Sequence, residues 1–271
     1  MKTDMEFPFF FEQISSLSEE DYEKIGFAGN PAYYGLHRAE VTSAHIPREP
    51  LESELKSVID AFFGGDDFKH AYLYSGPPGT GKSHTLEVLR NHCSEMNIPY
   101  VELRQDDSES LDMLSYMMEL SEANGVVLFC DCQTKFYEKL IKLGKVCIIG
   151  TGHAPRQELG SVVDEFKVFD LERDYPLSAD DIYALLTATL QKISLETAAS
   201  IPDSFLKKVS QMTNNPGLAL DTLGACLAIL AYKAKTGQCP EVTQEDIRYC
   251  CDKQFVRWLS GFRKLPVQHG G

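Results

Sequence analysis

The residues from Gly76 to Ser83 read Gly-Pro-Pro-Gly-Thr-Gly-Lys-Ser, which is the spacing of a phosphate-binding loop. Gly79 and Gly81 would let the backbone curl so that its N–H groups face phosphate oxygens, and a helix that begins here would add its dipole. Lys82 would bridge the β- and γ-phosphates of a nucleotide, while Ser83 would ligate Mg²⁺. A glycine-rich turn with an incidental lysine is the alternative interpretation. We expect a site for ATP or ADP built from Gly76, Pro77, Pro78, Gly79, Thr80, Gly81, Lys82, Ser83 and His84.

Such a site also needs a carboxylate at the end of an apolar strand, where it holds the shell of the Mg²⁺ ion. Asp131 directly follows the apolar stretch 126–130. We therefore assign Mg²⁺ to Ser83 and Asp131, the alternative for Asp131 being an acid that only ends a strand. Thr151, at the tip of a later expected strand, is a candidate catalytic sensor of the γ-phosphate, at even odds with a turn-forming role.

Strands and helices that could position these residues alternate along the middle of the chain. Alternating or continuous apolar residues predict strands over 70–76, 98–105, 125–132 and 145–152. Helical spacing predicts helices over 51–63, 82–96, 108–122 and 134–144, the first of them ended by Gly64 and Gly65. The alternation predicts an α/β fold, with a parallel sheet of at least four strands and helices on both faces.

The strands stop near residue 176, and the remaining pattern is helical. We expect helices over 177–193, 202–213, 216–237 and 243–262, with Ser178 and Thr243 as N-caps. Their apolar stripes are better explained as the core of a bundle than as membrane-binding faces. The expected organisation is an extension over 1–44, an α/β domain over 45–175, a helical subdomain over 176–265 and a tail over 266–271.

The extension is rich in aromatic and acidic residues, including Phe7 and the run 9–11. This much apolar surface either packs within the chain or binds a protein partner, and both interpretations stay open.

Composition narrows the classes of partner. A formal net charge of −14 makes the averaged surface repel phosphate backbones, so direct nucleic-acid binding is not expected. We expect neither a signal peptide nor an apolar run of the roughly 18 residues that span a membrane. Together these expectations predict a cytoplasmic protein. The cysteine pairs 130/132 and 250/251 have no second Cys/His pair at zinc-site spacing, so we do not expect a metal site at either pair.

A phosphate loop followed by a helical region resembles the AAA+ ATPases. Local segments resemble the replication-initiator branch of DnaA, Hda and the origin-recognition ATPases, over residues 45–55, 71–89, 148–159, 176–186 and 214–223. The resemblance implies a P-loop NTPase sheet with a helical AAA+ lid, and a clamp over the adenine at Ile46 and Pro47. It also implies protein partners and allows a homo- or hetero-oligomer.

The departures from the family concern hydrolysis. The glutamate that activates water in many AAA+ enzymes is replaced by Cys132, the arginine finger by Glu165, and an arginine of the lid by Gly217. An arginine finger contributes about 10³ to 10⁵ in rate, so slow turnover is expected. Arg156 and Arg173 could act as catalytic replacements or be ordinary solvated residues.

Three functions are compatible with these observations. The first is a nucleotide-dependent switch or adaptor in a multiprotein assembly, serving replication control or the loading of another ATPase. The second is an active AAA+ motor that works as an oligomer with arginine donated in trans. A small-molecule kinase suits the size of the chain but not its helical C-terminal third.

Overall fold

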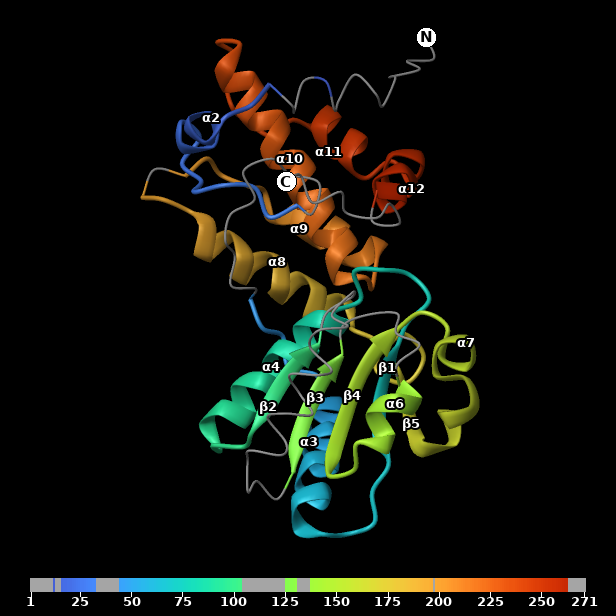
Figure 1. Cartoon of the computed structure of the whole chain (residues 1–271). Coiled ribbons are helices and arrows are strands. Elements are labelled where there is room, and N and C mark those ends of the chain that lie inside the picture. The colour runs from blue at the N-terminus through green and yellow to red at the C-terminus, as the bar shows by residue number, and fades with distance from the viewer. Residues whose placement is uncertain are drawn as a thin grey trace. The chain divides into compact units, whose positions relative to one another are not determined.

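The computed structural model describes residues 12, 16–32, 44–103, 125–130, 137–196 and 198–262 (Figure 1). The chain divides into two compact units. Pro47–Pro176 forms what we call the sheet unit, and Met1–Ile46 together with Leu177–Gly271 forms the helical unit. The sheet unit is thus one continuous segment, whereas the helical unit is built from both ends of the chain.

The sheet unit contains a parallel sheet. Its strands, within the described ranges, are β1 His70–Tyr74, β2 Tyr100–Leu103, β3 Val126–Cys130, β4 Val146–Gly152 and β5 Phe166–Asp170. The spatial order is β2-β3-β4-β1-β5, so the strand that leads into the phosphate loop lies between β4 and β5. The four predicted strands are confirmed, and β5 adds a fifth that the sequence did not predict.

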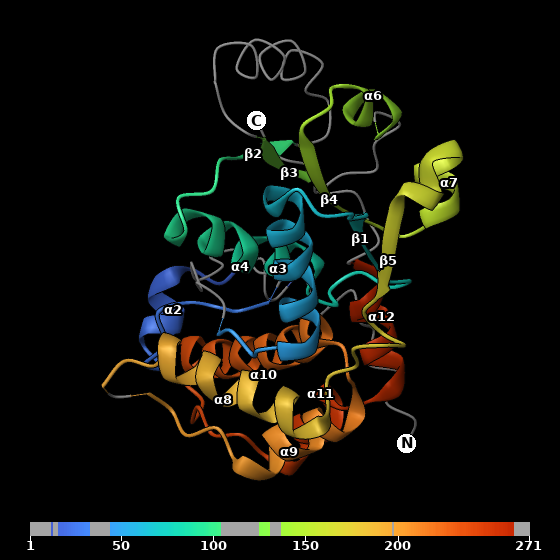
Figure 2. The same ribbon diagram turned by 90° about the horizontal axis from the view of Figure 1, so that it is seen from below.

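Helices cover both faces of this sheet, as predicted (Figure 2). Helices α3 (Glu49–Gly64) and α4 (Lys82–Glu95) pack on one face, where Ala71 and Leu73 of β1 point. Helices α6 (Tyr137–Lys142) and α7 (Pro155–Leu159) pack on the other face, with Tyr72, and the 3-10 helix η1 (Gly160–Glu165) follows α7. The predicted helix over 108–122 lies outside the described residues.

The first residue of β1 is a buried histidine. The Nδ1 atom of His70 accepts a hydrogen bond from the Ile148 N–H at 3.3 Å, and the rings of Phe68 and Phe166 pack against the imidazole. Burial lowers the pKa of His70 to about 4, because the charged imidazolium would lose its hydration.

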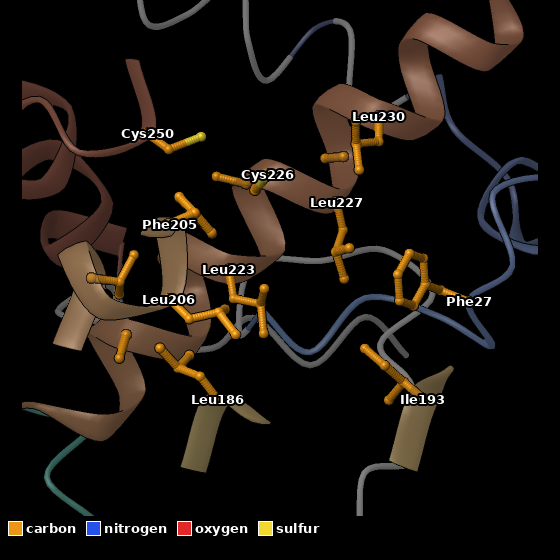
Figure 3. Packing of buried hydrophobic residues seen from close by; sticks show 14 of the residues in the cluster. Phe27, Leu186, Ile193, Phe205, Leu206, Leu223, Cys226, Leu227, Leu230 and Cys250 are labelled. Carbon is orange, nitrogen blue, oxygen red and sulfur yellow. The ribbon is translucent and has the colours of Figure 1, made fainter. Parts of the chain in front are cut away.

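The helical unit consists of α2 (Glu19–Glu23), α8 (Ala179–Ile193), α9 (Asp203–Met212), α10 (Pro216–Lys235), α11 (Gln244–Cys250) and α12 (Lys253–Phe262). Figure 3 shows its core, in which side chains of α8, α9 and α11 surround α10. Helix α10 is long and apolar enough to cross a membrane, so the expectation of no such run was wrong. Since 67% of its apolar window is buried, a core helix explains that composition.

The two predicted N-caps are confirmed. Ser178 Oγ accepts from the Asp181 N–H at 3.1 Å, and Thr243 Oγ1 accepts from the Asp246 N–H at 3.2 Å. The single helix predicted over 243–262 is instead two helices. The Asp252 carboxylate accepts from the N–H groups of residues 254 and 255, so it caps α12 and ends the continuity.

An N-terminal segment, residues 17–32, belongs to the core of the helical unit. Phe27 pairs with Ser194 in an antiparallel bridge and is buried in the cluster of Figure 3. Asn30 is fully buried and donates to the Gly224 carbonyl of α10 and to the Tyr22 hydroxyl, each at 3.0 Å. The aromatic residues 7–11, whose role the sequence left open, lie outside the described residues.

Candidate functional site

The loop between β1 and α4 has the geometry expected of a phosphate cradle. Gly79 and Gly81 have φ of +84° and +97°, a left-handed conformation that glycine adopts without strain. Helix α4 begins at Lys82 with Gly81 as its N-cap. The first N–H groups of an α-helix point out along its axis rather than to a helical carbonyl, which favours an anion at this end. The residues present fit nucleotide phosphates.

Ser75, the residue before the motif, braces the loop from inside. Its hydroxyl donates to the Pro77 carbonyl at 2.9 Å and lies 2.7 Å from Thr80 Oγ1. Because the single Ser75 proton is used at Pro77, Thr80 is the donor of that second bond. Lys82 Nζ donates to Ser75 Oγ at 2.9 Å. The serine therefore holds the lysine ammonium close to the loop.

Arg48 brings a second cation to the loop. Its Nη2 donates to the Thr80 carbonyl at 2.9 Å, and Nη1 lies 4.0 Å from the position that a Cβ on Gly81 would occupy. The guanidinium thus supports the turn just before α4. It adds positive charge beside the phosphate site of a chain whose net charge is −14.

The end of β4 adjoins the loop. The Ser75 N–H donates to the Gly152 carbonyl at 3.4 Å, and Thr151 is buried one residue earlier on β4, in register with Leu73. His153 follows, with Nδ1 lying 2.8 Å from the Ser75 carbonyl oxygen. The predicted sensor Thr151 therefore lies on the strand next to β1, at the same edge of the sheet as the loop.

Charged side chains that follow β4 and β5 differ in whether they contact the phosphate loop. The Gly76 N–H donates to Glu172 Oε2 at 3.1 Å. Arg173 makes two hydrogen bonds of 2.7 Å to the neighbouring Asp174. Arg156 is exposed on α7. Of the two candidate replacement arginines, Arg173 is engaged locally and Arg156 faces solvent.

Three residues bear on the expectation that ATP hydrolysis is slow. Glu165 is exposed at the end of η1, immediately before β5. Gly217 is buried in the first turn of α10 and offers no side chain. Cys132 lies outside the described residues, as does Asp131, the expected Mg²⁺ ligand.

Other predicted site residues are placed as follows. Ser83 is exposed in the first turn of α4, next to Lys82. Ile46 packs partly against the core of the helical unit, and Pro47 is the first residue of the sheet unit. No group of three or more metal-binding side chains occurs within the described ranges. The cysteines in the described ranges form no disulfide with one another.

Sequence reasoning missed three residues that shape the loop. They are Ser75, Arg48 and His153, which contact backbone carbonyls or Lys82. The spacing of residues in the sequence does not predict such contacts. The sequence did carry a signal for Ser75, which directly precedes the motif and is a small polar residue at the end of an apolar strand.

No protein-family model and no curated protein matches the sequence. Solved structures do match. The ORC2 protein of Aeropyrum pernix, in ADPNP-ADP complexes, matches with a TM-score of 0.55 at 10% identity over 78% of this chain and 69% of that chain. The ORC1 protein of Aeropyrum pernix in complex with DNA matches with a TM-score of 0.55 at 15% identity, over 78% of this chain and 66% of that chain.

Domain III of the Thermotoga maritima replication initiation protein DnaA matches with a TM-score of 0.50 at 17% identity, over 79% of this chain and 95% of that chain. At these identities the likeness establishes the fold. The chain has the fold of these ORC and DnaA structures, in which a parallel sheet is followed by a helical region, and this confirms the fold that the sequence resemblance implied.

Proposed function

We propose that this chain binds ATP and ADP at the phosphate loop and acts as a nucleotide-dependent switch or adaptor in a multiprotein assembly. The observation that carries the proposal is the loop itself. Its two left-handed glycines, the helix that begins at Lys82 and the Ser75 brace form a phosphate cradle within an AAA+ fold. The likeness to ORC and DnaA structures supports DNA replication or its initiation as the setting.

In this function each loop residue has a distinct part. Backbone N–H groups at the start of α4 and the Lys82 ammonium bind the β- and γ-phosphates. Ser83 and Asp131 would hold Mg²⁺, which when bound supplies positive charge that offsets the negative charge of the phosphates. Thr151 senses the γ-phosphate from the end of β4. ATP binding would then favour one conformation of the chain over another, because the switch rests on different affinities for the two states.

Hydrolysis is proposed to be slow or stimulated by a partner. An acid at Glu165 and no side chain at Gly217 stand where the related ATPases carry arginines, and neither can stabilise the charge of the transition state. Cys132 is a poor activator of water compared with glutamate.

Protein partners are proposed to bind through the region 1–44. Residues 17–32 are packed in the helical unit, so the aromatic residues near Phe9 are the better candidates for that contact. Assembly into a homo- or hetero-oligomer in the cytoplasm fits the proposal. The Aeropyrum ORC1 structure is a complex with DNA, but the net charge of −14 argues against direct nucleic-acid binding here.

One observation favours the alternative, an active ATPase with arginine donated in trans. Arg156 is exposed on α7, five residues after Thr151, where a neighbouring subunit could reach it. This alternative predicts turnover that rises with protein concentration and is lost in Arg156→Ala, while nucleotide affinity is unchanged.

The test is thermal unfolding with and without Mg²⁺ and nucleotide, using wild type and Lys82→Ala. At a nucleotide concentration of about 100 times Kd, binding stabilises the folded state by about 2.7 kcal/mol, which raises Tm by roughly 8 °C. Lys82→Ala should show little of this rise. No rise for wild type at millimolar ATP would refute nucleotide binding, and robust steady-state turnover by the isolated chain would refute a slow switch.

A further inference from the structure

His153 is the first residue after β4, and its side chain points back to the phosphate loop. The Nδ1 atom lies 2.8 Å from the Ser75 carbonyl oxygen and 3.1 Å from that of Gly76. Carbonyl oxygens only accept hydrogen bonds, so Nδ1 carries a proton and donates to both. A single imidazole thus ties the first turn of the loop to the end of the neighbouring strand.

A carboxylate fixes the position of this histidine. Glu158 Oε1 accepts from the backbone N–H groups of His153 at 3.1 Å and Ala154 at 2.9 Å. Its other oxygen, Oε2, accepts from the Tyr72 hydroxyl, and Tyr72 lies on β1, the strand that leads into the loop. The carboxylate therefore connects both strands that border the loop.

Gly152 leaves the space that this arrangement needs. A Cβ added there would lie well under 3.0 Å from both Glu158 Oε2 and the Tyr72 hydroxyl, closer than Cβ atoms come to other heavy atoms. The turn after β4 is thus shaped for one arrangement, in which Glu158 orients His153 and His153 contacts the loop.

We propose that His153 is a positioning residue for the phosphate loop, holding it in the shape that binds nucleotide phosphates. The loop contains two glycines with positive φ, and glycine has the greatest backbone freedom of any residue. Anchoring one end of the loop to a strand removes part of the ordering entropy that would otherwise oppose phosphate binding. The proposal rests on the nucleotide binding proposed above.

The expected effect is a loss of affinity. A hydrogen bond of this kind contributes about 1 kcal/mol net, so removing the donor should raise Kd for ATP and ADP by about fivefold to tenfold. The melting temperature without nucleotide should change little, because the rest of the sheet unit keeps its contacts.

Three substitutions separate the donor from the volume of the ring. In His153→Asn the side-chain amide nitrogen can occupy the place of Nδ1 and keep the donor. In His153→Gln the amide reaches toward the place of Nε2, and in His153→Ala there is no donor. Calorimetric titration of the full chain with Mg²⁺-ATP and Mg²⁺-ADP should give a Kd near that of wild type for the Asn variant. The Gln and Ala variants should bind about fivefold to tenfold more weakly.

The outcomes distinguish this proposal from the proposed function. If wild type binds, Lys82→Ala does not, and all three His153 variants bind as wild type does, nucleotide binding stands and the positioning role is refuted. An Asn variant as weak as the Ala variant would also refute it. If wild type and Lys82→Ala both fail to bind, the proposed function is wrong and this proposal falls with it. Should the Ala variant unfold, the comparison of Asn with Gln decides.

Discussion

A glycine in the middle of α10 gives the sharpest prediction about stability. Gly224 lies where the N-terminal segment contacts the helix, and its carbonyl accepts from Asn30 at 3.0 Å. A Cβ at this position would lie well under 3.0 Å from the Cβ of Ala32 and from Asn30 Oδ1, and 3.1 Å from the Ala32 nitrogen. The substitution Gly224→Ala therefore has to displace the segment or bend the helix.

The magnitude follows from three effects. Alanine favours a helix interior over glycine by about 1 kcal/mol. Overpacking of a filled core costs about 1–3 kcal/mol. Displacement of Asn30 also breaks its buried bonds to Gly224 and to the Ala32 N–H at 2.8 Å, at a cost of about 1–3 kcal/mol for polar groups left unsatisfied. We expect Gly224→Ala to lower the free energy of unfolding of the helical unit by about 3 kcal/mol.

The assay is urea unfolding followed by tryptophan fluorescence. Trp258 is the single tryptophan of the sequence and lies in α12, packed against Phe255, so its signal reports the helical unit. Gly261→Ala is the matched control, because Gly261 is an exposed glycine of α12, also in the helical unit, with no heavy atom within 4 Å of an added Cβ. This control should be neutral or stabilise the unit by up to about 1 kcal/mol.

The two substitutions are chemically identical, but only Gly224→Ala should lower the free energy of unfolding of the helical unit. A Gly224→Ala protein as stable as wild type would refute the reasoning, because it would show that the N-terminal segment does not press on α10 as described.

Three further predictions concern protons and caps. Since the pKa of His70 is about 4 when folded and near 6.5 otherwise, the folded state binds fewer protons between these values. The sheet unit should lose about 3 kcal/mol of stability as pH falls from 6.5 to 4, and circular dichroism melts of His70→Gln should show a flatter slope. Burial alone would raise the pKa of Asp21, but hydrogen bonds from Lys24, the Ser18 N–H and Lys235 outweigh it and lower the pKa. The helical unit should therefore keep this contribution above about pH 4 and lose it in more acidic solution, and urea unfolding of Asp21→Asn should show lower stability at pH 7 with a weaker acid dependence. Ser178→Ala should destabilise α8 by about 1 kcal/mol in the same assay, whereas Ser178→Asp, which can also cap, should change it little.

The sequence was sufficient to predict the elements that carry strong local signals. The phosphate loop has a complete motif, the strands before and after it are apolar, and the caps at Ser178 and Thr243 form capping boxes whose partners lie three residues ahead. In each case the cause lies within a few residues along the chain. Interactions between residues close in the sequence therefore determine these parts of the fold.

Two features of the fold were missed for identifiable reasons. Strand β5 has two exposed residues in its centre, Lys167 and Val168, so its pattern lacks the continuous apolar run of a central strand. The end of α11 was missed because the apolar spacing continues across Cys251, and only the capping role of Asp252 separates the two helices.

The contacts around the site could not be predicted because they join distant parts of the chain. Arg48 reaches Thr80, and His153 reaches Ser75, through backbone carbonyls that every residue possesses. Because the acceptor is a backbone carbonyl, the amino-acid type at that position does not reveal the contact in the sequence. The packing of α3 and α4 on the same face of the sheet brings Arg48 to Thr80, and the pairing of β1 with β4 brings His153 to Ser75.

The division of the chain into one continuous unit and one discontinuous unit has a consequence for synthesis. Asn30 and its partner Gly224 are separated by 194 residues, and the entire sheet unit lies between them. On the ribosome the N-terminal segment therefore emerges long before α10 exists, while the sheet unit can complete its own strands in the interval. Closing a contact of such long range is slow, so the last folding step should be the packing of residues 17–32 against α10.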